Sequence, residues 1–186
     1  METQTYLVTG AAGFIGWKVC EHLLAEDHSV VGVDNLNDAY DQRLKQWRLA
    51  QLQPRQNFVF QRLDICNATE LESVFSARRF DAVFNLAGRG GVRQSVLTPR
   101  EYYESNVLGT LSVLEMCRKF KIGKLVTAST ATVYGANALA PFREDASTDK
   151  PLSPYAASKK AAETLCYSYH HLYGLDVSVL RYFTVY

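Results

Sequence analysis

Short apolar runs alternate with amphipathic stretches from one end of this chain to the other. Most of the runs are continuous rather than alternately apolar and polar, which is typical of parallel strands covered on both faces. Strands that alternate with helices in this way indicate βαβ units with right-handed crossovers. We therefore predict an α/β fold in which helices cover both faces of a doubly wound parallel sheet of about six strands. The expected strands span 5–9, 29–33, 58–63, 81–87, 124–129 and 176–183, and the expected helices lie near 14–25, 40–52, 68–77, 100–120 and 154–173.

The composition is that of an ordinary globular protein, with 47% hydrophobic and 21% charged residues, and 186 residues favour a single domain. A net charge of +1 gives no electrostatic reason to expect nucleic acid or an anionic membrane as a partner. The four cysteines are far apart and show no CxxC spacing, so we expect no metal site, no disulfides and a reducing compartment. The N-terminal residues read directly as a strand and the sequence contains no long apolar run, so we expect no signal peptide and a location in the cytoplasm.

The stretch "LVTGAAGFIG" places Gly10, Gly13 and Gly16 where the first expected strand meets the first expected helix. Glycines allow a sharp turn and let a diphosphate approach the helix N-terminus, where free N–H groups and the helix dipole favour anions. The spacing is GxxGxxG rather than GxGxxG, and turn chemistry would explain an isolated match equally well. The position at the first strand–helix junction favours a Rossmann-like dinucleotide site, which would include Phe14 and Ile15.

Two carboxylates follow at the ends of the next two expected strands. Asp34, in "VGVDN", lies where it would accept hydrogen bonds from the adenosine ribose diol and repel a 2′-phosphate. NAD is therefore favoured over NADP, although an aspartate here could also cap a helix. Asp64, in "RLDI", is placed to meet the adenine edge. The remaining expected cofactor contacts of this kind are Asn35, Ile65, Leu86, Ala87 and Gly88.

A tyrosine and a lysine stand four residues apart in "SPYAASKKAAE", at the start of the last expected helix. Tyr155 and Lys159 therefore project from one face of that helix. An ammonium group near a phenol favours the phenolate, which makes Tyr155 a candidate base. Chance alone gives about half an instance of this pair per chain of this composition, and Lys159 could be a surface lysine like Lys160. The dinucleotide loop in the same chain favours the catalytic interpretation.

Three hydroxyl groups, those of Ser129, Thr130 and Thr132, follow the fifth expected strand in "TASTATVYG". Ligands of open α/β sheets bind beyond the carboxyl ends of the strands. A hydroxyl there can bridge a substrate oxygen and the phenolate, and the alternative for each is a cap on the strand-end backbone. We predict that all three bind substrate.

Taken in order, GxxGFIG, "NLAG", "STATVYG" and YxxxK resemble an extended short-chain dehydrogenase/reductase of the nucleotide-sugar epimerase/dehydratase kind. The longer strings "DNLNDAYDQRLKQWRLAQL", "GVRQS", "PFREDASTDKPLSPYAASKKAAE" and "VLRYFTVY" are similar to those of UDP-glucuronate 4-epimerases and are far more specific. The resemblance covers the whole chain.

This resemblance implies NAD-dependent conversion of UDP-glucuronate to UDP-galacturonate through a 4-keto intermediate. Tyr155 would take the proton of the sugar 4-hydroxyl, Thr130 would contact that hydroxyl, and Lys159 would bind the nicotinamide ribose. Hydride would pass to NAD and return to the opposite face of the sugar. Asn106, in "ESNVLGT", would lie beneath the cofactor, and otherwise it would be an ordinary helix-surface amide.

The residues after the catalytic threonine disfavour two related activities. The family's 4,6-dehydratases carry an Asp-Glu pair there, and its UDP-glucuronate decarboxylases carry a glutamate two residues on. This chain has Ala131 and Thr132, so elimination would lack its proton shuttle. UDP-glucose 4-epimerase stays open as the alternative enzyme, because sugar identity is read largely by the family's C-terminal domain.

The chain departs from the family at "LAGRGGVR", where the family has "LAARAGVR". Gly88 and Gly90 replace alanines, and extra glycine loosens a loop that would lie over the cofactor. Arg89 and Arg93 either face a phosphate or carboxylate or are solvated. Arg93 is the candidate substrate contact of the two.

In the family, "RYFTVY" precedes a Gly-Arg-Pro-Asp stretch and a C-terminal domain that binds uridine diphosphate. The resemblance therefore implies that residues 1–186 form an NAD(P)-binding Rossmann domain and that the substrate domain is absent. Because catalysis draws on remote binding energy, we expect little or no turnover by this chain alone. A non-catalytic single-domain NAD-binding protein is the alternative of a different class. The family also implies a homodimer through the helices near 100–120 and 154–173.

Overall fold

Six parallel strands form one sheet in the computed structural model, which describes residues 2–137 and 140–185. The strand order is β3-β2-β1-β4-β5-β6, and every neighbouring pair is parallel. The chain thus builds outward from β1 first on one side and then on the other, which confirms the predicted doubly wound fold. The strands are β1 (Thr5–Thr9), β2 (Ser29–Asp34), β3 (Phe58–Arg62), β4 (Ala82–Asn85), β5 (Lys124–Thr130) and β6 (Asp176–Tyr182).

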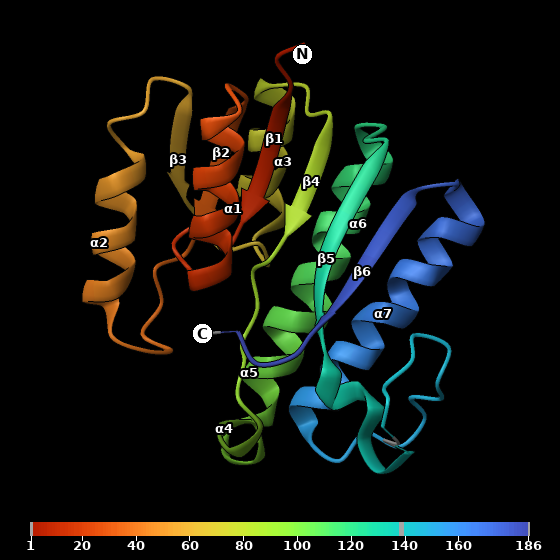
Figure 1. Cartoon of the computed structure of the whole chain (residues 1–186). Helices are drawn as coiled ribbons and strands as arrows, with labels where there is room; N and C mark the ends of the chain where they lie inside the picture. Colours follow the sequence, from red (N-terminus) through yellow and green to blue (C-terminus); the bar gives the residue numbers. More distant parts are fainter. Residues whose placement is uncertain (1, 138–139, 186) are drawn as a thin grey trace.

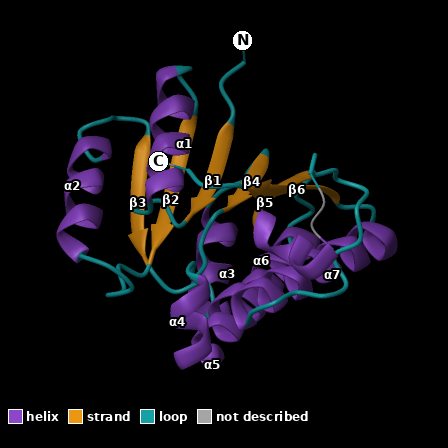
Figure 2. Cartoon of the chain, turned by 60° about the horizontal axis from the view of Figure 1, so that its bottom comes forward, coloured by secondary structure: helices purple, strands orange, loops and turns teal. Residues whose placement is uncertain are grey.

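Helices cover both faces of the sheet, as predicted (Figure 1). α1 and α2 lie over β1–β3 on one face, and Figure 2 shows α3 to α7 gathered on the other side. No helix of the described residues lies in front of β5 and β6 on the α1 side (Figure 1). The α-helices are α1 (Phe14–Ala25), α2 (Gln42–Leu52), α3 (Ala68–Ala77), α4 (Val92–Leu97), α5 (Pro99–Tyr103), α6 (Gly109–Lys119) and α7 (Pro154–Tyr173).

Each face of the sheet has its own apolar core. Side chains alternate along a strand, so Leu7 packs on the α3–α6–α7 side and Val8 on the α1–α2 side. Both of these side chains are completely buried. A central strand buried on both faces explains why its sequence is a continuous apolar run.

The predicted helix near 100–120 is interrupted in the structure. It divides into α5, a π-helix η1 (Glu104–Leu108) and α6. β5 is followed by a 3-10 helix, η2 (Ala131–Asn137), which was not predicted, and residues 138 and 139 lie outside the described ranges. α4 was not predicted.

The order in which strands are added reverses at β1, which pairs with both β2 and β4. The connections leaving the carboxyl ends of β1 and β4 turn to opposite faces and leave a crevice there. None of the helices in the described ranges is long and apolar enough to cross a lipid bilayer.

Candidate active site

The glycine turn lies at the crevice between β1 and β4 and forms part of its wall. Gly10 has a φ of +69°, and a Cβ on it would stand 2.8 Å from the backbone nitrogen of Ala87. Gly13 N donates to Gly10 O over 2.9 Å. A Cβ on Gly16 would stand only 2.1 Å from Gly10 O. The first and third glycines are therefore required for the chain to turn and for α1 to lie against the turn.

The N-terminus of α1 is open to a ligand. Its N-cap is Gly13, no side chain caps it, and its first turn contains no acidic residue. The first N–H groups of a helix have no partner within the helix, and together with the helix dipole they attract anions. This end of α1 can hold a phosphate group.

Asp34 ends β2 and is buried, with 7% of its surface exposed. Its carboxylate accepts hydrogen bonds from Ala12 N at 3.2 Å and Leu36 N at 2.8 Å. Lys45 Nζ of α2 lies 3.3 Å from the same carboxylate and 2.9 Å from Asn37 Oδ1. Asp34 does not cap α2, whose N-cap is Asp41, so the helix-capping alternative does not apply.

Asp64 is held by its neighbours at the end of β3. Its carboxylate accepts from Asn35 Nδ2 at 2.8 Å and from Cys66 N at 2.9 Å. Burial disfavours the charged form, but these hydrogen bonds outweigh burial and lower the pKa of Asp64. Asp64 and Asn35 therefore form one polar pair beside Asp34.

Two hollows adjoin at the glycine turn and share Gly10, Gly13, Tyr40, Leu86 and Gly88. The Asp34 hollow is otherwise lined, among the predicted residues, by Asp34, Asn35, Asp64, Ile65 and Ala87. The Tyr155 hollow is otherwise lined, among the predicted residues, by Phe14, Ile15, Gly16, Ser129, Thr130, Tyr155 and Lys159. Residues far apart in the sequence thus meet around one continuous crevice.

Lys159 is buried on α7, with 7% of its surface exposed, and burial lowers its pKa to about 8. Among the described residues, its ammonium donates to Ala128 O at 3.0 Å, which leaves further donor capacity toward the hollow. Tyr155 lies one turn earlier and packs edge-on against Tyr102, with 6.0 Å between ring centroids. Both side chains line the same hollow, as their spacing predicted.

The three predicted hydroxyl groups have different environments. Thr130 Oγ1 lies 3.1 Å from Thr132 Oγ1 and accepts from Thr132 N at 3.2 Å. Ser129 Oγ donates to Glu163 Oε1 of α7 at 2.5 Å. Thr132 does not line the Tyr155 hollow, and the predicted substrate contacts of all three residues stay predictions.

Asn106 is fully buried in η1 and holds the loop after β4 in place through hydrogen bonds. Its amide accepts from Arg89 N at 2.8 Å and donates to Arg89 O at 3.0 Å and to Ser158 Oγ at 2.9 Å. It is therefore not an ordinary helix-surface amide. A Cβ on Gly88 would stand 2.6 Å from Asn106 Oδ1 and 3.0 Å from Lys159 Nζ, so glycine lets these groups approach the loop.

The two candidate arginines lie in different places. Arg89 Nη1 is 2.8 Å from Glu101 Oε2, and Arg89 lines the Tyr155 hollow. Arg93 is exposed on α4 and lines neither hollow. The predicted contact of Arg93 with substrate stays a prediction.

Sequence reasoning missed Lys45, although a signal was present. Lys45, Leu49 and Leu52 are the buried residues of α2, and their spacing places them on one helical face. A lysine in register with buried leucines indicates a buried partner, which is Asp34. Tyr40 and Arg48, hydrogen-bonded to each other at 2.9 Å, also line the Tyr155 hollow and were missed.

Comparison with known proteins agrees with this geometry. The model of the NAD dependent epimerase/dehydratase family matches residues 6–186. The chain belongs to this family. Family membership confirms the resemblance inferred from GxxGFIG and YxxxK.

Among curated relatives, a UDP-glucuronate 4-epimerase of Thermodesulfobacterium geofontis is 56% identical over 181 residues, covering 97% of this chain and 56% of that relative. UDP-glucuronate 4-epimerase 4 of Arabidopsis thaliana is 42% identical and covers 98% of this chain and 42% of that relative. This family member therefore spans about half the length of the curated relatives that it matches.

Solved structures of the family show the same fold. UDP-glucuronic acid 4-epimerase from Bacillus cereus, in complex with UDP-glucuronic acid and NAD, superposes with a TM-score of 0.90 at 38% identity, covering 98% of this chain and 57% of that chain. UDP-glucose 4-epimerase from Thermotoga maritima gives a TM-score of 0.84 at 33% identity and covers 98% and 56%.

Proposed function

We propose that this chain is the NAD-binding part of a nucleotide-sugar epimerase that converts UDP-glucuronate to UDP-galacturonate. The observation that carries the proposal is the meeting of Tyr155, Lys159 and Thr130 in one hollow that begins at the uncapped N-terminus of α1. Dehydrogenase-type chemistry needs a proton acceptor beside a dinucleotide, and these groups supply one. The Bacillus cereus relative, bound to NAD and UDP-glucuronic acid, supports this assignment.

The residues fit NAD. The uncapped start of α1 suits the diphosphate, and the Asp34 carboxylate, already held by two backbone N–H groups, faces the hollow that would take the adenosine. Lys159 has donor capacity left for the nicotinamide ribose. Bound NAD supplies the hydride acceptor, so this chain's own residues need only bind, orient and move a proton.

The protein's part in the reaction is proton transfer at the sugar 4-hydroxyl. Tyr155 takes that proton, Lys159 favours the phenolate, and Thr130 holds the reacting oxygen through its hydroxyl. Neither Ala131 nor Thr132 carries a carboxylate that would serve elimination. This favours epimerisation over dehydration.

Turnover tests the proposal directly. The purified chain, supplied with NAD and UDP-glucuronate, is expected to form UDP-galacturonate far more slowly than a full-length relative, and Tyr155→Phe is expected to abolish that product. Chromatography of the nucleotide sugars measures both. Conversion of UDP-glucose instead would identify the alternative enzyme, and product formation that Tyr155→Phe leaves unchanged would refute the role of Tyr155.

The carboxylate of Asp34 should select NAD over NADP. In Asp34→Asn the charge that repels a 2′-phosphate is gone, and the ammonium of Lys45 becomes free to attract it. We expect NAD affinity to fall about tenfold and NADP affinity to rise, since losing a charged hydrogen-bond partner costs about 1.5–3 kcal/mol. Calorimetric titration of both dinucleotides measures the ratio, and an unchanged preference would refute this role.

We also propose that the protein acts in the cytoplasm as a homodimer, which would form through the helical regions near 100–120 and 154–173. Large apolar side chains are exposed on both helical regions predicted to meet, among them Tyr103, Leu108, Tyr167 and Leu172. Their burial against a second copy would remove apolar surface from water. Light scattering on the eluting protein would give twice 20.9 kDa if the proposal holds, and the monomer mass if it fails.

A further inference from the structure

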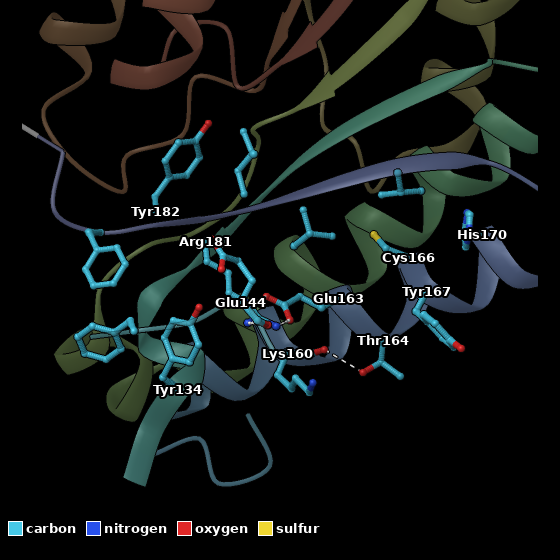
Figure 3. Close-up of a pocket in the computed structure, with 15 residues that line it drawn as sticks. Tyr134, Glu144, Lys160, Glu163, Thr164, Cys166, Tyr167, His170, Arg181 and Tyr182 are labelled. Atoms are coloured by element: carbon cyan, nitrogen blue, oxygen red, sulfur yellow. Dashed lines mark hydrogen bonds and ion pairs between the residues drawn. The ribbon is translucent and has the colours of Figure 1, made fainter. Parts of the chain in front are cut away.

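Glu163 carries a largely buried carboxylate that the proposed chemistry does not use. It lies on α7 one turn after Lys159 and two turns after Tyr155, and its side chain is 9% exposed. Arg181 of β6 donates to it twice, from Nε and Nη2, each at 3.0 Å. Figure 3 shows Glu163 pointing toward Arg181, with Tyr134 beside the pair.

The same carboxylate accepts the hydrogen bond from Ser129 of β5 at 2.5 Å. Ser129 is the residue before Thr130, and Ala128, which receives the hydrogen bond from Lys159, is the residue before Ser129. Two successive turns of α7 are therefore attached to two successive residues of β5. The strand that carries Thr130 and the helix that carries Tyr155 cannot shift past each other without breaking these bonds.

Arg181 ties a third element to this junction. It pairs with Ser129 across the sheet, and its guanidinium also donates to Glu144 O at 3.0 Å and lies 5.0 Å from the ring of Tyr134. A bidentate arginine–carboxylate pair has a fixed geometry, which orients the carboxylate toward the serine. Because the Ser129 hydroxyl donates its hydrogen bond to Glu163, this side chain lies on the α7 side of β5.

We propose that Glu163 is a positioning residue that, through Ser129 and Arg181, sets where Lys159 and Thr130 stand relative to cofactor and sugar. This inference rests on the proposed function. Reacting groups must be placed to within a fraction of an ångström, and a shift of about 1 Å can cost about a hundredfold in rate. Ser129 then serves the site by positioning it, in place of the direct substrate contact expected from sequence.

The test measures NADH affinity by fluorescence in the 186-residue chain. Glu163→Gln and Ser129→Ala are each expected to lower the affinity for NADH about tenfold, because Lys159 is displaced. The matched control is Glu115→Gln, which removes a carboxylate of α6 that accepts from Tyr169 of α7 and lines neither hollow. It should change thermal stability and leave NADH affinity within about twofold of the parent.

A double-mutant cycle separates positioning from a general loss of structure. If Glu163 acts through Lys159, Glu163→Gln should lower the affinity for NADH by less than about twofold in a Lys159→Met background, because the group that Glu163 positions is already gone. The proposal would be overturned if Glu163→Gln lowered NADH affinity equally in both backgrounds. It would also be overturned if neither Glu163→Gln nor Ser129→Ala lowered NADH affinity. Should Glu163→Gln fail to fold by circular dichroism, the milder Ser129→Ala carries the same cycle. A parent chain that binds no NADH would instead refute the proposed function, and this inference with it.

Discussion

Replacing Gly16 with alanine is expected to weaken NAD binding by about a hundredfold and to destabilise the fold by about 3 kcal/mol. The added Cβ would stand 2.1 Å from Gly10 O and 2.8 Å from Gly10 C, both backbone atoms that cannot rotate away. α1 would have to move off the glycine turn, and its N-terminus would leave the position from which it can hold a diphosphate. Calorimetric titration and chemical denaturation measure the two effects.

Gly123→Ala is the matched control for this substitution. Gly123 lies in the turn before β5, has no positive φ, and a Cβ on it would meet no heavy atom within 4 Å. We expect its stability to stay within about 0.5 kcal/mol of the parent and its NAD affinity to be unchanged. If Gly16→Ala behaved like this control, the close approach of α1 to the turn would not be what the site requires.

Replacing Lys159 with methionine is expected to stabilise the protein near neutral pH while weakening NAD binding. Burial lowers the pKa of Lys159 from 10.5 to about 8, so holding its charge costs the folded state roughly 3 kcal/mol. Methionine removes that cost. The hydrogen bond to Ala128 O is lost as well, which offsets about 1 kcal/mol and leaves a net stabilisation of about 2 kcal/mol. NAD should bind about thirtyfold more weakly, because a charged donor to the ribose is lost.

The pH dependence of this stabilisation identifies its cause. Between about pH 8 and 10.5 the unfolded chain holds the Lys159 proton more tightly than the folded chain, so the parent gains stability as pH rises. The advantage of Lys159→Met should therefore be constant below pH 8 and shrink above it. Lys160→Met, at the partly exposed neighbour, is the matched control. A stability difference that did not change with pH would contradict the buried charge.

The strands and most helices could be predicted because their sequence patterns report burial directly. Continuous apolar runs marked β1 and β2, and α1, α3 and α7 begin and end where their periodicity placed them. The break in the predicted helix near 100–120 could not be seen this way. Its apolar pattern continues through η1, and the interruption brings Asn106 to the backbone of Arg89, a residue of a distant loop.

The candidate site was predictable where one short motif defines a local shape. The glycine turn and the Tyr155–Lys159 spacing both depend on neighbours along the chain, and the structure brings them to one crevice. Glu163 depends on partners in other elements, so no local spacing singles it out. Lys45 shares a helical face with two buried leucines, and that spacing was the signal for its buried partner Asp34. For Ser129, strand alternation indicated a different environment from that of Thr130, because successive side chains of β5 point to opposite faces.

The most direct test of this account is calorimetric titration of the 186-residue chain with NAD and with NADP. We predict that NAD binds with one site per chain, that NADP binds at least about tenfold more weakly because of Asp34, and that Gly16→Ala weakens NAD binding about a hundredfold. A chain that is folded by circular dichroism yet takes up neither dinucleotide would contradict the central claim. The crevice between β1 and β4 would then not be a cofactor site.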